Sequence, residues 1–167
     1  MVNASTISCD AVWALLEEVT DPEVPVLSII DLGIVRDVQV SNDKVDIVIT
    51  PTYSGCPAMD TISLMIRMEL LSHGFTHINI TQQLSPAWTT DWMTENGKKK
   101  LKAYGIAPPN SMHSVCAPDV FAAEDAVQCP QCSSWHTRRL SEFGSTACKS
   151  LYQCEDCREP FDYFKCH

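Results

Sequence analysis

The sequence predicts an α+β fold in two parts, and two features of the chain carry the prediction. Residues 9–104 show helical and strand periodicities in the order helix, strand, strand, helix, strand, helix. Residues 129–157 begin and end with a C-x-x-C pair, and two such pairs at this separation are typical of a zinc ribbon. We therefore expect a body of helices and strands followed by a small β module held by a metal.

The first helix is predicted over residues 9–20. Its apolar side chains recur at the helical spacing i, i+3, i+4 and i+7, and they are Val12, Leu15, Leu16 and Val19. Ser8 is a suitable N-cap for this helix. Pro22 disfavours a helical conformation at Asp21, so the helix is expected to end there.

A hairpin and a second helix follow. Residues 34–40 and 45–50 alternate apolar and polar side chains and predict two strands. The segment 41–44, Ser-Asn-Asp-Lys, supplies turn-forming residues between them. Residues 57–72 carry an apolar face at helical spacing, and Gly74 suits the end of that helix.

The rest of the body adds one strand and one helix. Residues 76–84 alternate again and predict a third strand. Residues 91–104 predict a third helix, with Thr90 as its cap and Gly105 at its end. The order αββαβα predicts a small sandwich whose helices pack against one sheet.

The domain boundaries follow from where this periodicity ends. Residues 106–127 contain several prolines and few apolar anchors, a composition that indicates a linker. We therefore expect an αββαβα domain over residues 1–105, a linker over 106–127 and a ribbon over 128–167.

Composition disfavours several classes of function. The chain has 12 Lys and Arg against 21 Asp and Glu, a net charge of −9, so neither nucleic-acid binding nor a role as transcription regulator is expected. The apolar run from Val24 to Val35 is interrupted by Pro25 and Asp31, and no membrane span is expected. The nine cysteines do not resemble a secreted disulfide framework, and no signal-peptide pattern opens the chain. A reduced, cytoplasmic location is predicted.

Four cysteines form the strongest candidate site. The two C-x-x-C pairs supply four thiolates, the closed ligand set of a structural Zn²⁺ site, and the ligands are Cys129, Cys132, Cys154 and Cys157. Iron or an iron–sulfur cluster is the alternative occupant, because tetrahedral sulfur sites suit both. Cys148 and Cys166 are possible additional ligands, which could replace one of the four or bind a second metal.

Cys56 is the candidate functional residue of the body. It lies between the predicted strand 45–50 and the predicted helix 57–72, and Pro57 suits the first helical position. Free backbone N–H groups at a helix N-terminus favour an anion, so this thiol is expected to ionise readily and to serve as a nucleophile or metal ligand. The alternative is that Cys56 packs as a small apolar side chain.

Asp21 and Glu23 form a second candidate pair. Their carboxylates could approach the loop that holds Cys56. The alternative is a polar turn that simply ends the first helix, and the residues alone favour this simpler explanation.

Three segments of the body resemble the iron–sulfur cluster assembly domain family, which includes the SufT-like proteins. They are Asp21 to Leu27 (DPEVPVL), Asp31 to Val35 (DLGIV) and Thr52 to Pro57 (TYSGCP). The resemblance covers about residues 8–105. It implies the αββαβα fold and a reactive cysteine at Cys56.

Other segments resemble the PaaD family of bacterial phenylacetate catabolism. They are Trp88 to Met93, Glu142 to Lys149 and Pro160 to Cys166. This resemblance implies an association with the multicomponent phenylacetyl-CoA epoxidase. The oxygenase of that system carries a di-iron site, and its reductase carries a flavin and a [2Fe–2S] cluster.

The chain itself lacks the sequence signatures of those components. It has no Glu-x-x-His pair of a ferritin-like di-iron site, no glycine-rich dinucleotide fingerprint and no plant-type ferredoxin cysteine spacing. We therefore expect an accessory protein of the epoxidase system that is not itself catalytic.

The resemblance implies a maturation role with Cys56 at its centre. Cys56 would hold an iron–sulfur cluster or iron transiently for the reductase or the oxygenase, and a homodimer could share one cluster between two copies of Cys56. Asp21 and Glu23 would tune the site or bind iron, while Thr52 and Ser54 would donate hydrogen bonds to sulfur. The alternative is a structural subunit that docks the reductase onto the oxygenase.

The ribbon carries several aromatic side chains for its size. They are Trp135, Phe161, Tyr163 and Phe164. Some of them could form a patch that recognises a client protein. The alternative is that they build the minimal core of the ribbon.

Overall fold

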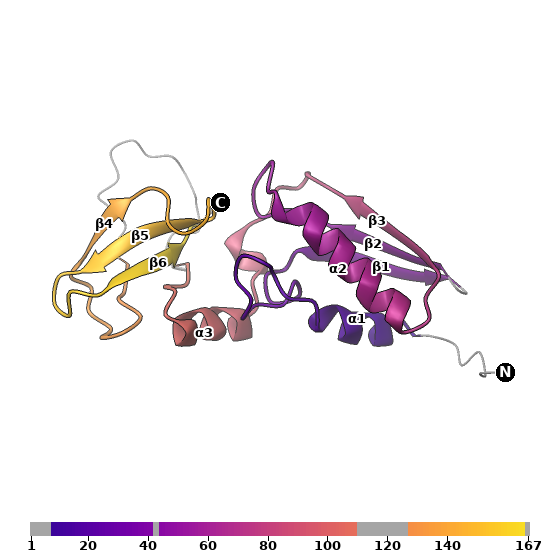
Figure 1. Cartoon of the computed structure of the whole chain (residues 1–167), viewed down its shortest axis with the longest axis horizontal. Coiled ribbons are helices and arrows are strands. Elements are labelled where there is room, and N and C mark those ends of the chain that lie inside the picture. The colour runs from indigo at the N-terminus through magenta and orange to yellow at the C-terminus, as the bar shows by residue number, and fades with distance from the viewer. Residues whose placement is uncertain (1–7, 42–43, 110–126, 166–167) are drawn as a thin grey trace. The chain divides into compact units, whose positions relative to one another are not determined.

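The computed structural model of the protein describes residues 8–41, 44–109 and 127–165 (Figure 1). The predicted turn residues Asn42 and Asp43, and most of the predicted linker, lie outside this description.

The contacts within the chain divide it into two compact units. The first unit runs to Trp88 and includes Trp92–Thr94. The second comprises Thr89–Asp91 and the chain from Glu95 onward. The third helix, which the sequence placed at the end of the first domain, is thus grouped by its contacts with the C-terminal ribbon.

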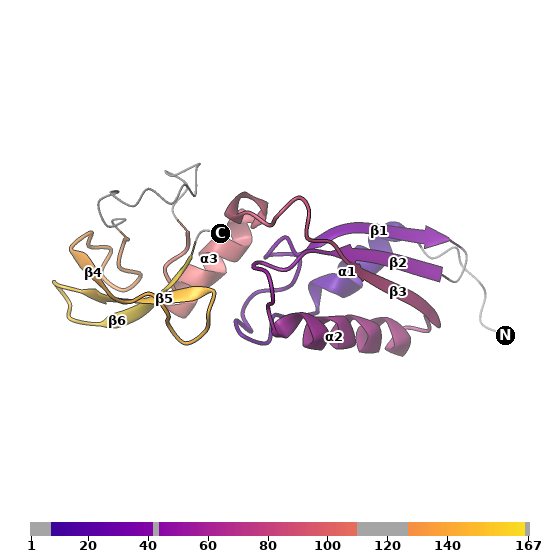
Figure 2. The ribbon, with the colours of Figure 1, turned by 90° about the horizontal axis from the view of Figure 1, so that it is seen from above.

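The first unit is a three-stranded sheet with two helices on one face (Figure 2). Its elements are α1 (Cys9–Glu17), β1 (Val35–Ser41), β2 (Lys44–Ile49), α2 (Ala58–Ser72) and β3 (His77–Gln82). β2 lies in the centre, antiparallel to β1 and parallel to β3. With α3 of the second unit, the predicted order αββαβα is confirmed.

The central strand shows why the sheet has one covered face. Val45, Ile47 and Ile49 are at most 1 % exposed, whereas the intervening Asp46 and Val48 are partly exposed. Side chains alternate between the faces of a strand, so the apolar set of β2 meets the helices. Each fully buried aliphatic side chain stabilises the fold by about 1.5–3 kcal/mol.

The ends of α1 differ in how well the sequence predicts them. Ser8 caps the helix as expected, because its Oγ accepts a hydrogen bond of 3.2 Å from the Ala11 N–H. The helix ends at Glu17 and not at residue 20, since Thr20 pairs with Ser28 in an isolated β-bridge. The chain has therefore already turned into the next loop before Pro22.

The third helix also begins later than predicted. A 3₁₀ turn, η1 (Thr90–Trp92), precedes α3 (Glu95–Tyr104), so Thr90 is not its cap. Thr94 is instead tied to Asp31, whose backbone oxygen accepts from the Thr94 N–H at 2.9 Å and whose Oδ1 accepts from the Thr94 hydroxyl at 2.7 Å. This long-range pairing holds residue 94 outside the helix.

The second unit contains α3 and an antiparallel sheet with the strand order β4-β5-β6. The strands are β4 (Thr137–Ser141), β5 (Lys149–Cys154) and β6 (Pro160–Phe164). The Tyr152 ring packs against two others, with its centroid 5.9 Å from that of Phe161 and 5.6 Å from that of Tyr163. These three buried aromatics form much of a small core.

Residues 106–109, predicted to begin the linker, pair with the sheet of this second unit. Ala107 pairs with Tyr163 in a parallel bridge: the Ala107 N–H donates to Asp162 O at 2.8 Å and the Phe164 N–H donates to Ala107 O at 3.0 Å. Ile106 and Ala107 are both buried. Within the described residues, no helix is long and apolar enough to cross a membrane.

Candidate functional site

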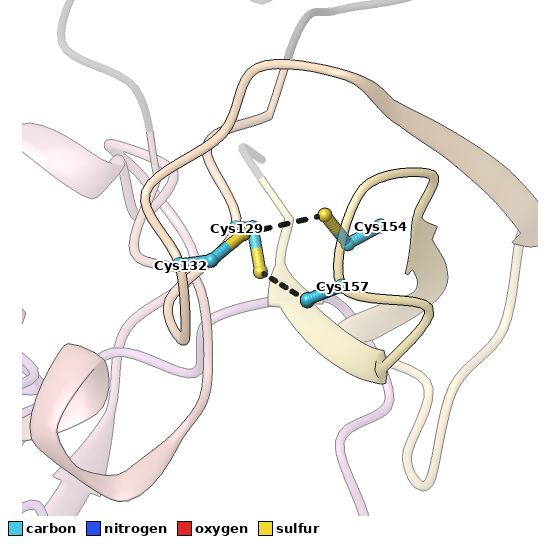
Figure 3. A group of neighbouring side chains, drawn as sticks. All are labelled: Cys129, Cys132, Cys154 and Cys157. Atoms are coloured by element: carbon cyan, nitrogen blue, oxygen red, sulfur yellow. Dashed lines mark hydrogen bonds between the residues drawn. The ribbon is translucent and has the colours of Figure 1, made fainter.

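Four cysteine sulfurs converge in the second unit (Figure 3). Cys129 and Cys132 come from the loop before β4, and Cys154 and Cys157 from the end of β5 and the turn that follows. All four Sγ atoms lie within 4.8 Å of one another. The Cys129–Cys157 sulfurs are 3.7 Å apart, and the Cys132–Cys154 sulfurs are 3.5 Å apart.

These distances fit a tetrahedral metal site. Sulfurs placed about 2.3 Å from a central Zn²⁺ lie about 3.8 Å from each other, close to the two separations above. The set offers four thiolates and leaves no position for a substrate, as in structural metal sites. The protein therefore has a four-cysteine metal-binding site whose donor set suits Zn²⁺.

The two metal-binding turns are built alike. The residue after the second cysteine is left-handed in each, with φ of +62° at Ser133 and +68° at Arg158. This conformation turns the next backbone N–H toward a sulfur, so Ser134 donates to Cys132 and Glu159 donates to Cys157. Backbone N–H donors of this kind stabilise thiolates.

Two further backbone hydrogen bonds, both to the Cys154 sulfur, favour loss of the first proton at that thiol. The N–H groups of Cys157 and Asp156 lower the pKa of the Cys154 thiol to about 7, against the effect of its burial. Metal binding requires deprotonated sulfur and releases these protons. In the same turn the Glu159 N–H opposes the shift, but burial and the neighbouring thiols raise the pKa of Cys157 to about 12, so Cys154 is the thiol of this turn that ionises first.

The two possible additional ligands are not part of this group. The buried Cys148 sulfur lies 3.0 Å from the Thr146 hydroxyl. It does not belong to the set of four among the described residues. Cys166 lies outside the described residues.

Cys56 occupies the loop between β2 and α2. Residues 53–56 form a tight turn in which the Cys56 N–H donates to Tyr53 O at 3.3 Å, and Gly55 has the positive φ, +80°, that such a turn requires. α2 begins immediately afterwards at Ala58. The thiol therefore lies at the N-terminus of the helix, as predicted, and it is half-buried.

The electrostatics of Cys56 differ from the expectation. Burial raises the pKa of the thiol above its ordinary value, and the charges of Glu23 and Asp21 act in the same direction. Hydrogen bonds from the Ala58 N–H and the Tyr53 side chain oppose this shift without cancelling it. The helix N-terminus thus acts in the expected sense, but the prediction of a readily ionised thiol is wrong because burial outweighs it.

Asp21 and Glu23 have distinct places in this site. Asp21 is buried, and its Oδ1 accepts hydrogen bonds from the backbone N–H groups of Glu23 at 2.7 Å and Val24 at 2.8 Å. It therefore fixes the turn on which Glu23 lies. Both carboxylates are close enough to Cys56 to influence its pKa.

The residues beside Cys56 contribute unequally. Thr52 is buried, Ser54 is exposed, and in the described structure the sulfur is hydrogen-bonded to neither. The side-chain partner is Tyr53, which sequence reasoning overlooked. The signal was present, because a glycine two residues after Tyr53 favours a turn that brings residues 53 and 56 together.

Comparison with known proteins follows the same two parts. Residues 9–74 match the family described as iron–sulfur cluster assembly protein. Residues 115–165 match the family described as PaaD zinc beta ribbon domain.

Individual relatives show the same division. A protein of Escherichia coli (strain K12), named as a putative subunit of 1,2-phenylacetyl-CoA epoxidase, is 52 % identical over 157 residues, which cover 93 % of this chain and 91 % of that protein. The "Fe-S protein maturation auxiliary factor" of Porphyromonas gingivalis (strain ATCC BAA-308 / W83) is 36 % identical over 89 residues, 52 % of this chain and 84 % of that protein.

A solved structure resembles the body alone. The crystal structure of a domain of unknown function, DUF59, from Bacillus anthracis is 29 % identical, with a TM-score of 0.53, and covers 56 % of this chain and 90 % of that one. The N-terminal domain is thus of the iron–sulfur assembly type, and the C-terminal module is a zinc ribbon. With both parts matched and one relative similar over nearly its whole length, the chain belongs to the PaaD family of phenylacetyl-CoA epoxidase proteins.

Proposed function

We propose that this protein is an accessory maturation factor of the multicomponent phenylacetyl-CoA epoxidase. In this proposal Cys56 holds an iron–sulfur cluster or iron in transit and passes it to the reductase or the oxygenase. The observation that carries it is the grouping of a half-buried thiol with the carboxylates of Asp21 and Glu23, in a domain that matches iron–sulfur assembly proteins.

The chemistry of Cys56 suits a carrier. Sulfur must lose its proton to bind a metal, and the pKa of this thiol is raised. A proton therefore competes strongly for the sulfur, which weakens the hold on a cargo and favours its release. A permanently bound cofactor would instead require thiolates that are stable at neutral pH. Cys56, with its raised pKa, does not provide such a thiolate.

The surrounding residues have supporting roles in the proposal. Glu23 supplies a hard oxygen ligand that suits iron, and Asp21 orients the turn that carries Glu23. Thr52 and Ser54 donate hydrogen bonds to sulfide or thiolate once a cargo is bound. Two copies of the chain could hold one cluster between their Cys56 residues.

The four-cysteine site has a different task. We assign Zn²⁺ to it as a structural ion, with Cys129, Cys132, Cys154 and Cys157 as ligands, because the sulfur separations match Zn–S geometry. The ion replaces a large hydrophobic core in so small a module. The ribbon then serves to recognise the client.

A second candidate function is a structural subunit that docks the reductase onto the oxygenase. The observation in its favour is the exposure of large apolar side chains on the ribbon, with Trp135 54 % and Phe143 63 % exposed. Such side chains often mark protein interfaces. Stable, stoichiometric co-purification with the oxygenase would favour this alternative over a transient maturation role.

The deciding experiment measures iron and acid-labile sulfide in the reductase after co-expression with the wild-type chain, with Cys56→Ala or without the chain. The proposal expects a depleted cluster in the last two cases. Cys9→Ala is the matched control, since Cys9 is a partly buried thiol that donates to Val38 O elsewhere in the domain. Di-iron content of the oxygenase is measured in parallel, and normal loading of both clients with Cys56→Ala would remove the carrier role.

A further inference from the structure

A polar bridge joins the two metal-binding turns outside the sulfur cluster. The Ser134 hydroxyl, from the first turn, donates to Asp156 Oδ2, from the second, with an oxygen–oxygen distance of 2.5 Å. The two residues are separated by the whole β4-β5 hairpin in the chain. Their contact is therefore a tertiary link and not part of either local turn.

Both ends of this bridge are also bonded to metal-binding sulfurs. The Ser134 N–H donates to the Cys132 sulfur, and the Asp156 N–H donates to the Cys154 sulfur. These two sulfurs are the pair that lies 3.5 Å apart. A continuous path of hydrogen bonds thus runs from one sulfur, through Ser134 and Asp156, to the other.

A neighbouring residue orients the bridge. The His136 N–H donates to the Ser134 Oγ at 3.0 Å, so that this hydroxyl accepts one bond and donates the other. The His136 ring nitrogen Nδ1 lies 3.5 Å from Asp156 Oδ1. The Glu155 N–H also donates to His136 O at 2.7 Å, which ties the backbones of the two turns together.

We infer that Ser134 and Asp156 are positioning residues of the metal site, and that their hydrogen bond slows the loss of the metal by locking the two turns together. A four-thiolate site loses its ion by releasing sulfurs one after another. A released sulfur that is held in place rebinds before the next one leaves. Substitution of a residue that is hydrogen-bonded to a metal ligand commonly lowers metal affinity by about 10–100-fold.

The competing explanation is a surface contact without consequence. Asp156 is 56 % exposed, and hydrogen bonds between exposed side chains contribute little to stability. The two explanations differ in the rate at which the ion leaves, which is measurable without any enzymatic activity.

The test uses the zinc-loaded full-length chain and an excess of a colorimetric zinc chelator, with the absorbance of the chelate giving the rate of release. Asp156→Ala and Ser134→Ala are each expected to release zinc about tenfold faster than wild type. The double variant is expected to be no faster than either single one, because both substitutions remove the same bond. Asp156→Asn keeps an acceptor oxygen and is expected to stay near the wild-type rate.

Glu142→Ala is the control for loss of an exposed, hydrogen-bonded carboxylate on the ribbon. Glu142 follows β4, its side chain is 56 % exposed like that of Asp156, and its Oε2 accepts a hydrogen bond of 2.8 Å from Arg139. Its variant should release zinc at the wild-type rate. Cobalt loading verifies each variant, because the absorption bands of tetrahedral four-sulfur cobalt should be unchanged.

Three results would overturn the inference. They are wild-type release by Asp156→Ala and Ser134→Ala, equal acceleration by Asp156→Asn and Asp156→Ala, or equal acceleration by Glu142→Ala. If Asp156→Ala fails to bind cobalt, Ser134→Ala decides the question, since it removes the same hydrogen bond and leaves the Asp156 carboxylate in place.

Discussion

Gly33 lies against the backbone of Trp92, in a left-handed conformation with φ of +67°. A Cβ atom at residue 33 would collide with the Trp92 carbonyl oxygen and lie 2.8 Å from the Trp92 Cβ. Arg36 also contacts Trp92, since its guanidinium lies 3.4 Å from the centre of the Trp92 ring. The segment 31–35 therefore fits its neighbour only when residue 33 lacks a side chain.

Gly33→Ala is expected to lower the free energy of unfolding by about 3 kcal/mol, the sum of about 1–2 kcal/mol for a left-handed alanine and about 1–3 kcal/mol for the collision. Urea unfolding of the metal-loaded chain measures this change in the free energy of unfolding. Gly74→Ala is the matched control, because Gly74 also has a positive φ, +89°, but open space around it. Equal losses in the two variants would contradict the close contact.

A buried carboxylate network fixes the same region. Asp31 is 2 % exposed and accepts a hydrogen bond of 2.7 Å from the Thr94 hydroxyl. Asp31→Ala is expected to lower the free energy of unfolding by about 2 kcal/mol, because it leaves buried donors unpaired. Thermal unfolding followed by circular dichroism checks this result.

Asp37→Ala is the control for the loss of an aspartate. Asp37 is exposed on β1, where its carboxylate accepts from Gln39. A change within about 0.5 kcal/mol is expected for this surface position. If Asp31→Ala has no larger effect, the network with Thr94 does not stabilise the unit.

The order and type of the elements could be predicted because the apolar periodicities of the body are regular. α2, for example, buries Ile62, Ile66 and Leu70 at the helical spacing. The four-cysteine cluster could also be predicted, because the spacing of the four cysteines identifies it. Both features depend on patterns within short stretches of the sequence, namely the apolar periodicity and the cysteine spacing.

What the sequence did not predict depends on long-range contacts. The start of α3 follows from the pairing of Thr94 with Asp31, and residues 106–109 join the ribbon through the bridge between Ala107 and Tyr163. The raised pKa of Cys56 depends on burial, which no local pattern reports. Of the ribbon aromatics, Phe161, Tyr163 and Phe164 are buried and Trp135 is exposed, so most of the set builds the core.

The reactivity of Cys56 should depend on pH in a defined sense. The raised pKa means that the thiol is mainly protonated at neutral pH, so alkylation by iodoacetamide should accelerate by about tenfold per pH unit from pH 7 up to that pKa. Glu23→Gln removes a charge that raises the pKa, so it should lower the pKa and speed alkylation at pH 8. Tyr53→Phe removes a hydrogen bond that lowers the pKa and should slow alkylation.

Mass spectrometry of the peptide that contains Cys56 gives its alkylation rate apart from the other thiols. Glu17→Gln, an exposed change on α1, is the control and should leave the rate unchanged. Wild-type alkylation rates in both Glu23→Gln and Tyr53→Phe would show that burial alone sets the pKa.

Removal of the metal should unfold the second unit and leave the first folded. The core of the second unit includes the ligands Cys129 and Cys154 beside Tyr152, so the loss of the ion removes part of that core itself. In hydrogen–deuterium exchange after chelation, the amides of β5 should lose protection while those of β2 keep it. Protection of β5 that survives full chelation would show that the ribbon folds without its ion.

Two cysteine variants separate the role of the metal from the loss of a thiol. Cys154→Ser removes one of the four ligands and should bring about the same loss of β5 protection without a chelator. Cys148→Ser changes a buried thiol outside the four-sulfur group, beside Thr146, and should retain one metal ion per chain and a protected β5. Loss of the ion in Cys148→Ser would instead make Cys148 a ligand, because its sulfur contributes to no other site among the described residues.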